Sequence, residues 1–166
     1  MIHADFYSKL RPPAETPSDE MCRCNAIQPI KLMYALSYNP LHCVICNLEV
    51  APESLALNGR LIEAIVDWRD LFAAIDHLWL DSGDYEEWAK QQLVDINSPV
   101  NQRGLALCKA LDGLRRCYYW YFQDQSREGF EPITRCPRCD EPLIPFEDGL
   151  FRQLVCEPCR IITVGE

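Results

Sequence analysis

Long apolar runs are missing from this sequence. No stretch approaches the roughly 18 uninterrupted apolar residues that a membrane-spanning helix needs. The first fifteen residues, MIHADFYSKLRPPAE, also lack the basic start, apolar run and small-residue cleavage site that mark a secretion signal. We therefore expect a soluble protein that stays in the cytoplasm and has no membrane partner.

Positive charge is scarce as well. The chain has 16 Lys and Arg residues against 25 Asp and Glu residues, which gives a formal net charge of -9 at pH 7. Most of the imbalance lies in residues 61–100, where 9 acidic side chains outnumber 2 basic ones. A broad electrostatic attraction to nucleic acid or to an anionic membrane is therefore disfavoured.

The motifs of common enzyme sites are absent too. The sequence has no HExxH, no glycine-rich phosphate loop and no arrangement of Cys, His and Asp that would activate a nucleophile. Its three histidines, His3, His42 and His77, are scattered along the chain. We therefore predict a binding protein without catalytic residues or a small-molecule substrate.

Cysteine, in contrast, is abundant, with ten in the chain. Four of them form two CxxC pairs, CPRC and CEPC, at Cys136, Cys139, Cys156 and Cys159. Two such pairs on a hairpin can place four thiolates tetrahedrally around one Zn²⁺, at about 2.3 Å from each sulfur. In a reducing compartment this spacing favours metal ligation over disulfides. Because four cysteines leave no position for water or substrate, we expect a structural zinc site.

A second candidate zinc site lies nearer the N-terminus, where CRC and CVIC contribute Cys22, Cys24, Cys43 and Cys46. Two alternatives stay open here: His42 replaces one of the cysteines, or the site is degenerate. Two structural Zn²⁺ sites would move the formal charge to about -13. The remaining Cys108 and Cys117 are interpreted as small buried hydrophobes of the third helix that do not face each other well.

Three segments are predicted along the chain, and together they indicate an α+β fold. Residues 1–53 form a tail and a zinc-ribbon-like segment, residues 54–130 a helical core, and residues 131–166 a C-terminal zinc ribbon. In the core, apolar side chains recur at helical spacing over residues 54–80, 85–93 and about 100–124. Asp84 is expected to cap the second helix, and Ser98 with Pro99 to begin the third. The stretch CYYWYF is apolar on every side, so periodicity does not decide between a helix end and a strand.

Arginines alternate with aromatic side chains in the last third of the chain, which suggests a partner surface. We single out Arg135, Arg138 and Arg152, with neighbouring aromatics such as Phe151. Arginine beside an exposed ring can hold phosphates and stack on unpaired bases, but the same residue types also dominate protein interfaces. Acids nearly cancel the arginines in this region, so RNA or DNA, a protein partner and an ordinary solvated surface all stay open.

Taken together, the motifs resemble a known family. CRC, SYNPLHCVICNLEVAP, GLALCKAL, RCPRC and GLFRQLVCEPCRIIT follow the order and approximate spacing of bacterial zinc-ribbon-containing proteins to which nucleic-acid binding is ascribed. The chain is similar to the shorter, double-CxxC members, and the resemblance implies one metal group in each ribbon. It differs where a glycine commonly follows a CxxC knuckle, because Asn47, Asp140 and Arg160 stand there instead. Asn and Asp tolerate a left-handed turn more easily than Arg does.

Some related double-CxxC proteins resemble immunity partners of bacterial toxins. A basic toxin surface would be attracted by the acidic residues of the helical core, Asp67, Asp70, Asp76, Asp81 and Asp84. Two functions are therefore expected: a zinc-ribbon adaptor or nucleic-acid-binding protein, and an immunity-type inhibitor that neutralises a toxin.

Overall fold

The computed structural model describes residues 15–25, 27–35 and 37–165, and over these residues the fold is α+β, as predicted. Its α-helices are α1 (Gly59–Asp81), α2 (Glu86–Val94) and α3 (Pro99–Asp112). A 3-10 helix, η2 (Pro52–Leu55), precedes α1. The strands are β1 (Ile30–Leu32), β2 (Leu41–Cys43), β3 (Cys117–Trp120), β4 (Ile144–Pro145), β5 (Gln153–Cys156) and β6 (Ile161–Val164). Over the same part of the chain, none of the helices has the length and apolarity needed to cross a membrane.

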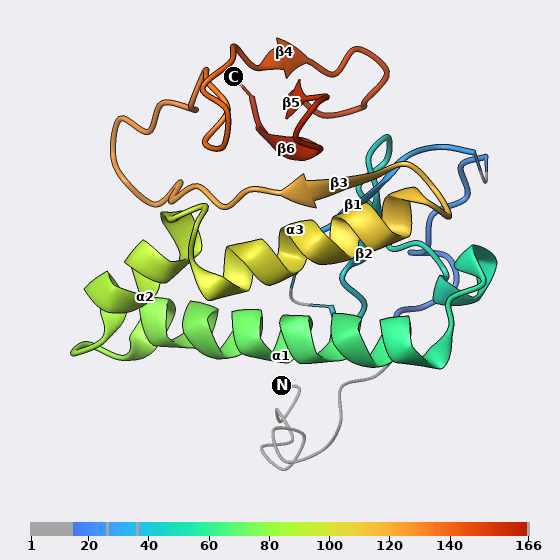
Figure 1. Ribbon diagram of the computed structural model, residues 1–166, viewed down its shortest axis with the longest axis horizontal. Coiled ribbons are helices and arrows are strands. Elements are labelled where there is room, and N and C mark those ends of the chain that lie inside the picture. Colours follow the sequence, from blue (N-terminus) through green and yellow to red (C-terminus); the bar gives the residue numbers. More distant parts are fainter. Residues whose placement is uncertain (1–14, 26, 36, 166) are drawn as a thin grey trace, which may run out of the picture.

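The strands form one mixed sheet in the order β2-β1-β3-β6-β5-β4. β1 and β6 both pair with β3 in parallel, while the outer pairs β1·β2, β5·β6 and β4·β5 are antiparallel. β3 follows the helices in the sequence, and it joins the strands of the N-terminal ribbon to those of the C-terminal ribbon (Figure 1). The two ribbons are therefore halves of one sheet. The division into segments 1–53, 54–130 and 131–166 stays a prediction.

The helices lie together beside this sheet. Figure 1 shows α1, α3 and β3 stacked in that order, with β4, β5 and β6 beyond β3. α1 packs on α2 and α3, and α3 packs on β3 and β1. The buried face of α1 consists of apolar residues at three- and four-residue steps: Ile65, Trp68, Phe72 and Ile75. This spacing is what places one continuous apolar stripe against the sheet side of the molecule.

The first two helices lie close to where the sequence predicts them. α1 begins at Gly59 because the side chain of Asn58 accepts a hydrogen bond from the Leu61 amide at 2.9 Å. Asp84 does not cap α2, so that expectation is wrong: Tyr85 is at the cap position, with no side-chain cap bond. The turn is held instead by the Ser82 hydroxyl, which accepts from the Tyr85 amide at 3.1 Å.

The third helix begins as predicted but ends earlier. Ser98 caps it by accepting from the Asn101 amide, and Pro99 occupies its first turn. The helix stops at Asp112, whereas its pattern predicts an end near residue 124. The apolar stretch after it is strand β3, because neighbouring strands satisfy its backbone: the Tyr119 amide donates to the Arg160 carbonyl at 2.7 Å. Such long-range pairing has no local sequence signal.

β3 is buried on both sides, which explains why its sequence does not alternate with polar residues. Cys117 and Tyr119 pack into the larger apolar core that contains the helices. Tyr118 packs into a smaller cluster with Val44, Val155 and Ile162. The sheet therefore has a core on each face.

Candidate metal centres

The N-terminal metal group consists of Cys22, Cys24, Cys43 and Cys46, as predicted. All four sulfur atoms lie within 4.8 Å of one another. Cys43 ends β2 and Cys46 follows in the next turn, whereas the CRC segment is tied to this hairpin by the Cys22 amide, which donates to the Glu49 carbonyl at 2.7 Å. The Cys24 amide also donates to the Cys22 sulfur at 3.4 Å. Backbone pairing between Met21 and Glu49, which are 28 residues apart in the sequence, therefore brings the two half-sites together.

The C-terminal metal group consists of Cys136, Cys139, Cys156 and Cys159, and its sulfur atoms also lie within 4.8 Å of one another. The Cys139 and Cys156 sulfurs are 3.6 Å apart. One pair lies in the loop before β4, and the other is at the turn between β5 and β6. The antiparallel pairing of β4 with β5 brings these two pairs to one end of the ribbon.

Each CxxC pair is followed by a residue in the left-handed region. Asn47 has φ 63°, Asp140 has φ 61° and Arg160 has φ 53°. In two of these turns the amide of the left-handed residue donates back to the first cysteine's carbonyl, from Asn47 to Cys43 at 3.0 Å and from Asp140 to Cys136 at 2.9 Å. The three residues that replace the usual glycine therefore adopt the conformation for which glycine is normally selected.

The donor sets fit a tetrahedral metal ion. Zinc–sulfur bonds of about 2.3 Å place tetrahedral sulfurs about 3.8 Å apart; the Cys139–Cys156 separation of 3.6 Å is close to this value, and all separations in both groups are within 4.8 Å. His42 is outside the N-terminal group, and its Nδ1 lies 3.1 Å from the Asn47 carbonyl oxygen. Among the described residues, four thiols and no imidazole form that site, and both groups can hold a metal ion.

The thiol pKa values differ among the cysteines of each group. Burial raises the pKa of the Cys22 and Cys156 thiols. A hydrogen bond from the Glu141 amide is the main reason that the pKa of Cys139 is lowered, and hydrogen bonds from the neighbouring thiols lower it further. At Cys46, burial acts upward, but the Leu48 amide and the adjacent thiols lower the pKa overall. Cys46 and Cys139 therefore ionise more easily than Cys22 and Cys156, from which a metal ion would have to displace protons.

Cys108 and Cys117 differ from the expectation in one respect. Cys108 lies in α3, but Cys117 begins β3, so the two do not share a helix. Their sulfurs are 3.5 Å apart, and both residues are at most 1% exposed. They face each other across the helix–sheet contact, contrary to the prediction, while their burial agrees with a packing role.

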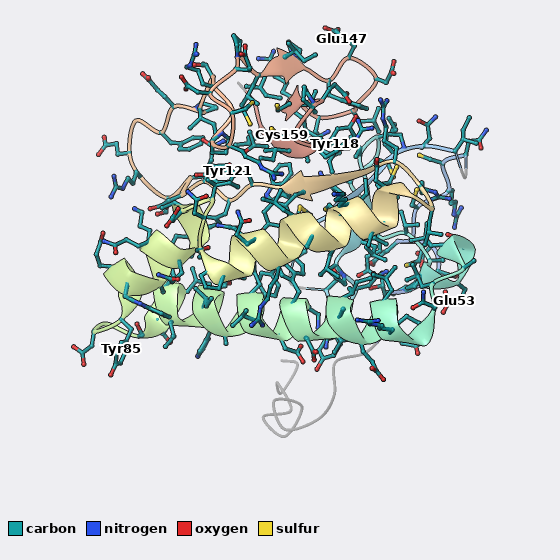
Figure 2. All side chains as sticks on the ribbon, viewed as in Figure 1. Glu53, Tyr85, Tyr118, Tyr121, Glu147 and Cys159 are labelled. Carbon is teal, nitrogen blue, oxygen red and sulfur yellow. The ribbon has the colours of Figure 1, made fainter. Side chains whose placement is uncertain are left out.

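The predicted partner residues Arg135, Arg138 and Arg152 are all exposed, but they do not form one surface. Arg135 pairs with Asp140 at 2.9 Å. Arg138 lines a cleft between α3 and the C-terminal metal group. Arg152 lines a separate groove on the β4–β5 hairpin, which we call the hairpin groove. Figure 2 shows Glu147, which also lines the hairpin groove, at the end of the molecule farthest from α1.

A buried polar link between the two ribbons has no counterpart in the sequence patterns. Lys31 of β1 is only 2% exposed; its Nζ donates to Gln153 Oε1 at 2.8 Å and lies 4.4 Å from the centre of the Trp120 ring. Gln153 Nε2 donates in turn to the Val44 carbonyl at 2.9 Å. Burial lowers the Lys31 pKa to about 8, against the opposing effect of Cys43 and Cys46. A single charge within IKL carries no sign of a partner 122 residues away.

Comparison with known protein families gives a match over the helical part of the chain. A family model described as a domain of unknown function (DUF2310) matches residues 26–123, more than half of the chain. The protein belongs to this family. No curated protein and no solved structure matches it. The DUF2310 match includes Cys43, Cys46 and the three helices, and it ends shortly after β3.

Proposed function

We propose that this DUF2310 protein is a zinc-stabilised binding protein that performs no catalysis and contacts a protein partner through its C-terminal ribbon. Zinc is the metal that suits two closed sets of four cysteine thiolates. Four protein donors leave no coordination position for water or substrate, so the ion would hold the fold together. Both groups lie where the chain has short strands and turns, which need such support.

We choose this surface because of the hairpin groove, which has a volume of about 610 Å³. Large apolar side chains are exposed in and beside it: Leu150 is 76% exposed, and Ile144 and Phe151 are each 52% exposed. Aromatic anchors beside an arginine such as Arg152 are typical of the energetic centre of a protein interface. The apolar side chains exposed on this hairpin would provide most of the contact energy.

Charge favours a protein over RNA or DNA as the occupant. Glu147 lines the hairpin groove and the exposed Asp148 follows it, while Arg135 is already paired with Asp140. A phosphate backbone would meet these acids and a chain of net charge -9. A segment with apolar and basic side chains complements both the groove and its acidic rim, so this is the partner chemistry that we propose.

The test compares two exposed apolar positions. Phe151→Asp places a charge in the hairpin groove, and Leu80→Asp, at a residue 59% exposed on α1, is the matched control. Partners would be cross-linked in the native host, treated with nuclease, identified, and then titrated as purified proteins. We expect a partner that binds wild type and the Leu80 variant alike and binds the Phe151 variant at least about tenfold more weakly, about 1.4 kcal/mol.

Two results would contradict the proposal. One is capture that disappears on nuclease treatment, together with binding of a single-stranded oligonucleotide that weakens steeply with salt, which would assign the ribbon to nucleic acid. The other is equal binding by the two variants, which would remove the hairpin groove from the interface.

A second candidate function, toxin neutralisation, is favoured by the charge of α1 and of the turn after it. Asp67, Asp70, Asp81 and Asp84 are exposed there, whereas Asp76 is half-buried. Such a surface would speed encounter with a basic toxin. An adjacent toxin gene whose purified product is inhibited by this protein would support the immunity role, and an uninhibited product would end it.

A further inference from the structure

A second groove, of about 590 Å³, lies between α1 and α3 and is here called the helix groove. Its small residues are alanines from both helices: Ala64, Ala106 and Ala110. Larger apolar side chains line it beside them, namely Leu61, Trp68 and Leu107. Because alanine fills little space between two helices, the groove leaves room for large side chains from another molecule.

The charges of the helix groove differ in sign from those of the chain as a whole. Arg60 lines it from α1 and Arg103 from α3, and Asp67 is the acid in the lining. Both arginines are exposed, and within the described residues neither forms an ion pair or a side-chain hydrogen bond. In a protein of net charge -9, two unpaired guanidinium groups on opposite walls of an apolar groove are a local exception. Their complement is an apolar segment that carries acids.

Leu114 extends this surface beyond α3. It follows the helix, lines the groove and is 52% exposed. The groove thus has apolar side chains along its length and cations on both walls, which is the pattern that receives one face of an amphipathic helix. All of its lining residues fall within the DUF2310 match at residues 26–123, whereas the hairpin groove lies outside it.

We propose that the helix groove binds an acidic amphipathic helix of a protein partner. The apolar face of that helix would insert large side chains over Ala64, Ala106 and Ala110, and its carboxylates would pair with Arg60 and Arg103. This site is independent of the hairpin groove and of its partner. A protein that used both would join an acidic helix to a basic segment, as an adaptor does.

The test uses the full metal-loaded chain and two synthetic amphipathic helical peptides that share a leucine and phenylalanine face. One peptide carries glutamates on its polar face and the other carries lysines. Fluorescence anisotropy measures both affinities at low and moderate salt. We expect the acidic peptide to bind at least about tenfold more tightly than the basic one, with an advantage that shrinks as salt rises.

Two matched pairs of variants locate the site. Ala110→Leu fills the groove, while Ala74→Leu adds the same side chain at an exposed position on α1 that does not line it. Arg103→Glu reverses a groove charge, while Lys109→Glu makes the same change elsewhere on α3. We expect each groove variant to lower the affinity for the acidic peptide by about fivefold or more. Each control variant should lower this affinity by less than about twofold.

Three outcomes would overturn the proposal. The first is equal affinity for the acidic and the basic peptide. The second is a groove variant whose affinity for the acidic peptide equals that of its control. The third is a wild-type dimer, seen by sedimentation, that Ala110→Leu converts to a monomer. The last result would assign the helix groove to a second copy of this chain. None of these outcomes bears on capture at Phe151, so the two proposals fail separately.

Discussion

At the scale of single residues, the turns after the cysteine pairs show how a backbone requirement is met without glycine. A left-handed non-glycine residue costs about 1–2 kcal/mol. Asn47 and Asp140 have short side chains that tolerate this conformation. Arg160 does not, but its guanidinium group pairs with Asp112 at 3.2 Å and with Glu157 at 2.6 Å. These contacts offset the backbone cost and tie the turn to the end of α3.

Asp140 allows this cost to be measured. Replacement by Gly or by Ala removes the same carboxylate, so the loss of the exposed Arg135 pair is common to both variants. Only Gly adopts φ 61° freely. We expect Asp140→Ala to be less stable than Asp140→Gly by about 1 kcal/mol, measured by chemical unfolding of the metal-loaded protein. Equal stability of the two variants would show that the turn relaxes.

At the scale of elements, the contact of α3 with β3 depends on the absence of one side chain. A Cβ at Gly104 would lie 2.2 Å from Tyr119 Cε2 and 2.9 Å from Trp68 Nε1. Next to this contact, the Tyr119 hydroxyl donates to Asn101 Oδ1 at 2.6 Å, and Asn101 Nδ2 donates to the Leu93 carbonyl at 3.0 Å. The same contact therefore also satisfies carbonyl groups at the end of α2.

Gly104→Ala tests this packing. Helix propensity alone would favour alanine by about 1 kcal/mol, but overpacking against Tyr119 and Trp68 costs about 1–3 kcal/mol. We expect a net loss of stability and a lower melting temperature. Gly113→Ala is the control, because its Cβ would meet nothing closer than the Ala110 carbonyl at 3.6 Å. A Gly104 variant as stable as the control would contradict the packing role.

How much could be predicted from sequence also differs between elements. The helical periodicity and the Ser98 cap are local signals, and they located α1, α2 and the start of α3. The spacing of the cysteines predicted both metal groups, because each half-site is short in sequence. The end of α3, the position of Cys117 opposite Cys108, and the Lys31–Gln153 bond all depend on parallel pairing across β3. Pairing between distant segments leaves no periodic pattern in either of them.

At the scale of the whole molecule, the two metal groups lie in opposite halves of one sheet. The N-terminal group follows β2 at one edge of the sheet, and the C-terminal group adjoins β5 and β6 in the other half. β3 and the Lys31–Gln153 bond connect these halves. We therefore expect loss of one metal ion to destabilise the ribbon that held it first. The destabilisation would then extend to the other ribbon through β3.

Cys156→Ser tests the ligand assignment at this scale. We expect metal content to fall from two ions per chain to one, and hydrogen exchange in β5 and β6 to quicken by about tenfold or more. Cys108→Ala is the control: it should lose packing energy but keep both ions, because Cys108 belongs to neither group. A serine variant that keeps two ions would refute the assignment.

The same prediction extends to pH. Protons compete with the metal for the thiolates, so acidification should release the ions and lower the melting temperature, and neutralisation with fresh Zn²⁺ should restore both. Burial, which raises the pKa of Cys22 and Cys156, makes those thiolates the more readily reprotonated. Metal content and melting temperature measured over the same pH series would check this, and a melting temperature that stays constant while ions leave would contradict a structural role.

The central position of β3 also bears on how the chain is made. A polypeptide leaving the ribosome completes β3 at Trp120, yet the strand that covers its far edge begins only at Ile161 (Figure 1). Translation at about 5–20 residues per second leaves that edge open for about 2–8 seconds. An apolar strand with unpaired amides is a template for wrong partners during this interval. We therefore expect the nascent chain to be most prone to wrong pairing while the residues between β3 and β6 are being made.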